Sequence, residues 1–63
     1  MNYFIEYIGY GSMNTQYEEN LEIKTTLDWN RPAHTEDFMH LVHYNIKKNF
    51  LKFKIVSIQI SED

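Results

Sequence analysis

Two stretches of the chain carry the pattern of β-strands. In residues 18–27 (EENLEIKTTL), apolar and polar positions alternate with the period of two that is typical of a half-buried strand. Residues 2–8 (NYFIEYI) are rich in strand-forming residues and contain no strand breaker. Between them, residues 9–16 supply Gly, Ser and Asn, which favour turns. The pattern predicts a β-hairpin with a long loop.

A helical pattern follows the hairpin. Apolar residues recur at the spacing of one helix face: Phe38, Leu41, Val42 and Ile46. Pro32 disfavours helix at the residue before it. Thr35 is a suitable N-cap, and Asn49 readily adopts the left-handed conformation that stops a helix. We therefore expect a helix from about Thr35 to Asn49.

The last apolar segment, residues 51–60 (LKFKIVSIQI), predicts a third strand whose alternation changes phase. Its apolar residues fall into two sets on opposite faces: Phe53 and Ile55, then Val56, Ile58 and Ile60. Two interpretations are open. Either both faces of the strand are partly covered, or a β-bulge near Ile55–Val56 turns Phe53 and Ile55 into the core.

The element order ββαβ predicts one α+β domain over residues 1–63. We expect a three-stranded antiparallel sheet in spatial order 2-1-3, with the helix packed on one face. Glu6 is charged, so the residues that alternate with it in the first strand should face the helix. The expected core is Tyr3, Ile5, Tyr7, Leu21, Ile23, Leu27, Phe38, Leu41, Val42, Ile46, Val56, Ile58 and Ile60.

Without a bulge, the other face of the sheet would carry four large apolar residues in one patch: Phe4, Ile8, Phe53 and Ile55. Soluble monomers avoid such patches. A chain of 63 residues without cysteine is also marginally stable alone, by roughly 3–5 kcal/mol. The patch therefore predicts a homodimer interface or a docking site. With the bulge, only Phe4 and Ile8 would remain outside.

Trp29 and Arg31 lie in the irregular connection before the helix. Both residue types are enriched among interface hot spots, so we assign them to the interface as well. The alternative is that Trp29 folds back and caps the small core.

Catalytic and cofactor motifs are missing from the sequence. There is no cysteine to act as a nucleophile or a thiolate ligand. Gly9 and Gly11 give only G-x-G, and no helix follows, so nucleotide-binding patterns fail. We expect neither an enzyme, nor a cofactor, nor a small-molecule substrate.

Histidine forms the one cluster with metal-binding potential. Glu36, His40 and His43 are spaced so that they share a face of the predicted helix, and His34 lies in the loop before it. Such a set can hold a divalent cation with an open position. The alternative is a solvated helix face with Glu36 and His40 as a side-chain pair. We expect no structural metal here.

Charge and hydropathy limit the partners further. The formal net charge of −3 is divided into −5 over residues 1–40 and +2 over residues 41–63. A nucleic-acid binder would show a stronger basic footprint, so we do not expect one. The N-terminal segment resembles no signal peptide, and no apolar run is long enough to span a bilayer. We expect a cytoplasmic protein without membrane contact.

The segments YFIEYIGYG, HTEDF and KIVSIQISE, with the alternating strand between the first two, resemble the short proteins that bacteriophages and prophages encode. Size and element order are similar to those of anti-CRISPR and other anti-defence proteins. This resemblance implies non-catalytic inhibition of one host protein in the host cytoplasm, often by a homodimer. A small dimeric assembly protein and a metal- or nucleic-acid-binding regulator are the alternatives.

Overall fold

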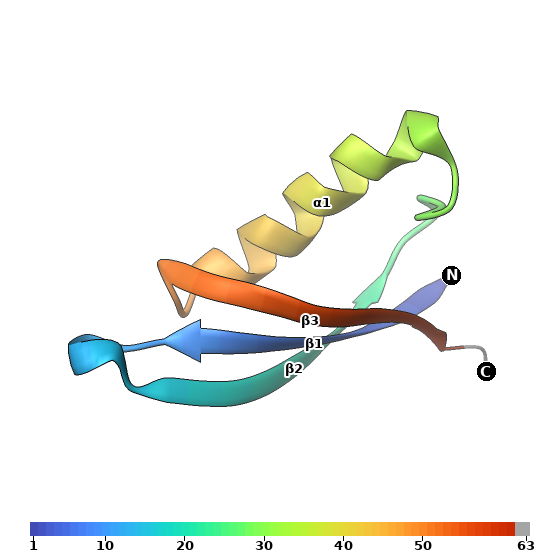
Figure 1. Cartoon of the computed structure of the whole chain (residues 1–63). Coiled ribbons are helices and arrows are strands. Elements are labelled where there is room, and N and C mark those ends of the chain that lie inside the picture. Colours follow the sequence, from blue (N-terminus) through green and yellow to red (C-terminus); the bar gives the residue numbers. More distant parts are fainter. Residues whose placement is uncertain (62–63) are drawn as a thin grey trace.

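The chain folds into three antiparallel strands, β1 (Asn2–Tyr10), β2 (Gln16–Lys24) and β3 (Lys52–Ser61), and one long helix, α1 (Pro32–Lys47). The sheet has the order β2-β1-β3. The computed structural model describes residues 1–61. Helix α1 lies across one face of the sheet (Figure 1). This confirms the predicted α+β fold and its strand order. A short 3-10 helical turn, η1 (Ser12–Asn14), lies between β1 and β2.

The hairpin loop is shorter than the sequence predicts, because β1 continues through Gly9 to Tyr10. Gly9 is a packing position and not a turn residue. A Cβ atom on Gly9 would lie 2.5 Å from the ring of Phe50, which follows α1 and packs against the core. The turn itself contains Met13 and Asn14, both with left-handed backbone (φ 58° and 59°).

Helix α1 begins at Pro32, three residues before the predicted start. Proline suits the first helical position, and it holds Arg31 in an extended conformation as expected (φ −92°, ψ 121°). The helix ends at Lys47. The predicted left-handed stop at Asn49 is wrong, because within residues 1–61 the positive φ angles belong to the hairpin turn.

The core lies between α1 and the sheet. All of its buried apolar members were predicted: Tyr3, Ile5, Tyr7, Ile23, Phe38, Val42 and Ile46. Leu21, Leu27, Leu41 and Ile58 are partly buried against them, as are Met39 and Phe50, which the sequence pattern did not place in the core. Val56 and Ile60 were expected inside but are 58% and 43% exposed.

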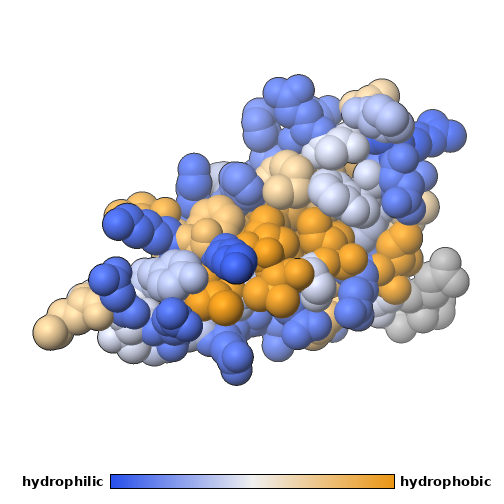
Figure 2. All heavy atoms as spheres, viewed as in Figure 1, coloured by the Kyte–Doolittle hydropathy of each residue, from blue (hydrophilic) through white to orange (hydrophobic). Residues whose placement is uncertain are grey.

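A β-bulge in β3 explains the exposure of Val56. Glu6 pairs with Ser57 and the next residue, Tyr7, pairs with Ile55, so Val56 has no partner on β1. The extra residue reverses the alternation of the strand at this point. Phe53 and Ile55 therefore face α1, on the same side as Ile58, and the bulge interpretation is confirmed. Figure 2 shows apolar side chains gathered where α1 lies over β3.

Tyr3 ties β1 to the connection that leads into α1. Its side chain is fully buried, and its ring lies edge-on to Phe38 at 4.6 Å between centroids. The hydroxyl donates a hydrogen bond to the Leu27 carbonyl (3.0 Å) and accepts one from the Trp29 amide (2.9 Å). One buried side chain thus satisfies two backbone groups of an otherwise irregular segment.

Tyr3→Phe tests this link. The substitution keeps the ring and leaves the Leu27 carbonyl and the Trp29 amide without their partner, which costs about 1–3 kcal/mol. We expect urea denaturation to show that loss of stability. Tyr44→Phe is the matched control, because Tyr44 is exposed on α1, and it should change stability by less than about 0.5 kcal/mol. Equal stability of both variants would contradict the role given to the Tyr3 hydroxyl.

Candidate protein interface

The sheet face opposite α1, which we call the open face, is not covered by any element within residues 1–61 (Figure 1). Side chains alternate between the faces of a strand. Because Tyr3, Ile5 and Tyr7 are buried under the helix, their neighbours in β1 point to the open face. Strand pairing places residues of β2 and β3 beside them, so the three strands present one continuous surface.

Apolar and charged residues share the open face, and on β1 the exposed Glu6 lies between Phe4 and Ile8. Phe4 and Ile8 from β1 are half-buried, and the bulge adds the exposed Val56 from β3. Ile8 pairs with Glu18 on one side and with Lys54 on the other. Ile8 and Val56 line one hollow of this face, and we call these two residues the apolar centre. Apolar residues bordered by charged ones are usual in a protein–protein interface.

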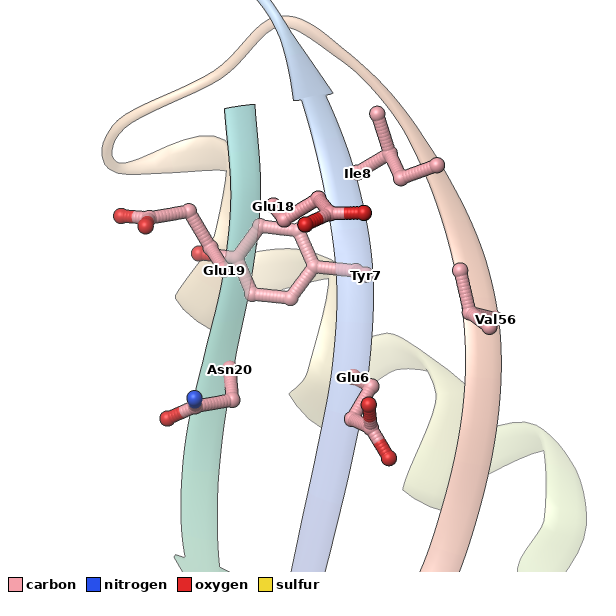
Figure 3. Close-up of a pocket in the computed structure, with 7 residues that line it drawn as sticks. All are labelled: Glu6, Tyr7, Ile8, Glu18, Glu19, Asn20 and Val56. Atoms are coloured by element: carbon pink, nitrogen blue, oxygen red, sulfur yellow. The ribbon is translucent and has the colours of Figure 1, made fainter. Parts of the chain in front are cut away.

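A shallow hollow of about 290 Å³ lies on this face, and its lining residues come from all three strands (Figure 3). Ile8 and Val56 supply aliphatic surface, and Glu6 and Glu18 supply carboxylates. Glu6 also accepts a hydrogen bond from the Ser57 hydroxyl (3.2 Å). A Lys or Arg side chain of a partner fits this chemistry, because its stem is apolar and its head group pairs with carboxylates.

Tyr7 contributes to the lining of the hollow from β1, but its side chain is almost fully buried. Burial raises the pKa of its hydroxyl above the usual 10.0, and the nearby Glu19 carboxylate raises it further. A tyrosine hydroxyl is protonated at neutral pH even without such a shift, so the raised pKa only moves its ionisation to more alkaline pH.

The predicted apolar patch of four residues is wrong in composition. Phe4 and Ile8 lie on the open face as expected. Phe53 and Ile55 face α1 and pack against the core, because the bulge reverses the alternation of β3. Val56 takes their place on the open face, and the phase change in the sequence was the signal that could have found it.

Trp29 and Arg31 do not belong to the open face. The Trp29 ring lies 5.3 Å from that of Phe38 and packs against the core, so the alternative in which it caps the core describes its position. Arg31 is exposed before α1, with its Nε atom 3.9 Å from an Asp28 carboxylate oxygen. An exposed pair of this kind contributes little to stability.

The histidines are directed to different neighbours. The His34 Nδ1 atom accepts a hydrogen bond from the Asp28 amide (3.0 Å). The His43 ring packs edge-on against Phe53, with 5.1 Å between the centroids. Among residues 1–61, no three side chains of the metal-binding types come together in a group that could hold a metal ion.

A chelator experiment tests the expectation that no structural metal is held. We expect EDTA to leave the melting temperature of the purified protein unchanged, because the candidate ligands Glu36, His40 and His43 are not gathered into a site. Melting would be followed by circular dichroism with and without EDTA. A drop in melting temperature that Zn²⁺ restores would contradict the expectation and assign these three residues as ligands.

Comparison with known proteins adds no family to this description. No protein family matches the chain, and neither a curated protein nor a solved structure is detectably similar to it. In the part of the chain that the structure describes, no helix is long and apolar enough to cross a membrane. The function is therefore argued from the surfaces of the molecule.

Proposed function

We propose that this chain is a non-catalytic protein-binding module that docks on one partner protein through its open face and thereby modulates that partner. The observation that carries the proposal is the combination of Phe4, Ile8 and Val56 on a face that α1 leaves uncovered. One face of the sheet is used for folding, and the other remains available for a partner.

The energetics of the open face favour docking. Complete burial of an apolar side chain of this size is worth roughly 1.5–3 kcal/mol, and Val56 is 58% exposed. Glu18 and Lys54 stand on opposite sides of Ile8, so charges of both signs border the apolar centre. Rim charges contribute to the choice of partner and to the association rate more than to affinity.

The class of partner follows from the resemblance in the sequence. The resemblance to anti-CRISPR and other anti-defence proteins implies inhibition of a host protein by direct binding. We therefore propose a bacterial host protein, met in the host cytoplasm, as the partner. A partner with a Lys or Arg side chain at the interface centre would match the hollow formed by Glu6, Glu18 and the two aliphatic residues.

Affinity capture from bacterial lysate tests this proposal with three forms of the protein. The wild type is compared with Val56→Glu, which places a charge in the apolar centre, and with Tyr44→Glu, which places the same charge on the exposed side of α1. We expect one stoichiometric partner with the wild type and with Tyr44→Glu, and roughly tenfold or greater loss with Val56→Glu.

Melting curves must first show that both variants keep the fold. Undiminished capture of the same partner by folded Val56→Glu would contradict docking through the open face. Capture of no stoichiometric partner by any of the three forms would contradict the host-protein proposal as a whole.

A further inference from the structure

Strand β3 has an outer edge that nothing pairs with in the described part of the chain. It lies at the border of the sheet, with β1 on its inner side, and Figure 1 shows no element beyond it. The strand is long, at ten residues, and rich in Ile. The free N–H and C=O groups of such an edge form a template for another strand.

We propose that β3 pairs antiparallel with β3 of a second copy of this chain, so that two three-stranded sheets join into one of six strands. The surface involved is the edge of the sheet, and the proposal does not depend on what the open face binds. A two-fold axis perpendicular to the sheet relates the copies, so both helices lie on the same side and the two open faces become continuous.

The face pattern of β3 is symmetric about the bulge, which makes the strand complementary to itself. Phe53 and Ile55 precede Val56–Ser57, and Ile58 and Ile60 follow it, with all four apolar side chains on the side of α1. In the antiparallel register centred between Val56 and Ser57, Ile55 lies opposite Ile58 of the second copy. Phe53 then lies opposite Ile60. Without the bulge, the same register would set residues of opposite faces against each other.

The four apolar side chains of β3 on the α1 side are partly exposed, as expected if the space beside the β3 edge is filled by another strand. Phe53, Ile55 and Ile58 are only partly buried although they face the helix, and Ile60 is 43% exposed. Apolar side chains are visible along this side of the molecule in Figure 2. Pairing with a second β3 would place further apolar side chains beside them, as cross-strand pairs stabilise a sheet.

The charges of β3 select the antiparallel direction. Lys52 and Lys54 are in the first half of the strand, and its second half carries no charge. In the proposed register Lys54 lies opposite Gln59 of the second copy, and Lys52 lies opposite Ser61. Parallel pairing in register would bring lysines side by side, which is unfavourable. Lysines and bulges often protect an edge, but here both are compatible with self-pairing.

The other edge of the sheet, formed by β2, does not favour pairing with a second copy of itself. Strand β2 is mostly exposed and carries three glutamates. Antiparallel self-pairing along its whole length is centred on Asn20 and would set Glu18 opposite Glu22 of the second copy. Like charges in that position are destabilising. The sequence therefore protects the edge at β2 and leaves that at β3 available.

Disulfide trapping tests the register, because the chain has no cysteine of its own. Lys54→Cys and Gln59→Cys are combined in one chain, where about 16 Å of strand separates them and prevents an internal disulfide. In the proposed dimer, the thiol at position 54 of each copy lies opposite the thiol at position 59 of the other copy. We expect mild oxidation to give a covalent dimer of twice 7.7 kDa. The matched control, Asn20→Cys on β2, would lie opposite itself in a paired β2 edge and keeps both Glu18 and Glu22, so it should remain monomeric.

Sedimentation of two further variants separates the edge from the open face. Ile60→Lys places a charge in the proposed contact, and we expect it to sediment as a monomer where the wild type is dimeric. Ile8→Lys alters the open face of the central strand, and we expect it to remain dimeric. A dimer that Ile8→Lys dissociates and Ile60→Lys does not would overturn the edge proposal. So would a monomeric wild type at tens of micromolar, or trapping at β2 as readily as at β3.

Discussion

The bulge at Val56 is the constraint on which the rest of the structure depends. One helix can cover one face of a three-stranded sheet, so β3 must bring its apolar residues to that face. Plain alternation would divide them between two faces, because Phe53 and Ile55 are out of phase with Ile58 and Ile60. The unpaired Val56 corrects the phase and is itself left on the open face. The same residue thus shapes the core, the open face and the outer edge.

In a fold this small, one face of the sheet forms the core, and the remaining sheet surfaces are left for partners. Seven apolar side chains are buried in the core, and the connection into α1 is fixed by hydrogen bonds to one of them, Tyr3. A core of this size gives marginal stability. The surfaces that α1 leaves free, the open face and the edge of β3, are therefore the places where a partner adds stabilising contacts. We propose a foreign protein for the first surface and a second copy for the other.

The regular parts of the structure were predictable because they follow simple periods. The period-two strands and the helical stripe gave the fold, the strand order and every buried apolar side chain. Three features depended on contacts between distant residues. The phase change in the β3 sequence fits either a strand covered on both faces or a strand with a β-bulge. Only the pairing of β3 with β1 distinguishes these two interpretations. Gly9 is typical of a turn until Phe50 packs on it. Trp29 suits either a hot spot or a core, and the structure packs it against the core. Only Phe4 and Ile8 of the six residues predicted for the interface lie on the open face.

Thiol labelling at single introduced cysteines tests the bulge most directly, because each thiol would be the only one in the chain. Lys54→Cys, Val56→Cys and Ile58→Cys would be treated with a maleimide under native conditions, after each is shown to be folded. The structure predicts that position 56 reacts about as fast as the exposed position 54, and that position 58 reacts much more slowly. If position 56 were protected as strongly as position 58, both would share one face, and the account of the core, the open face and the β3 edge would be contradicted.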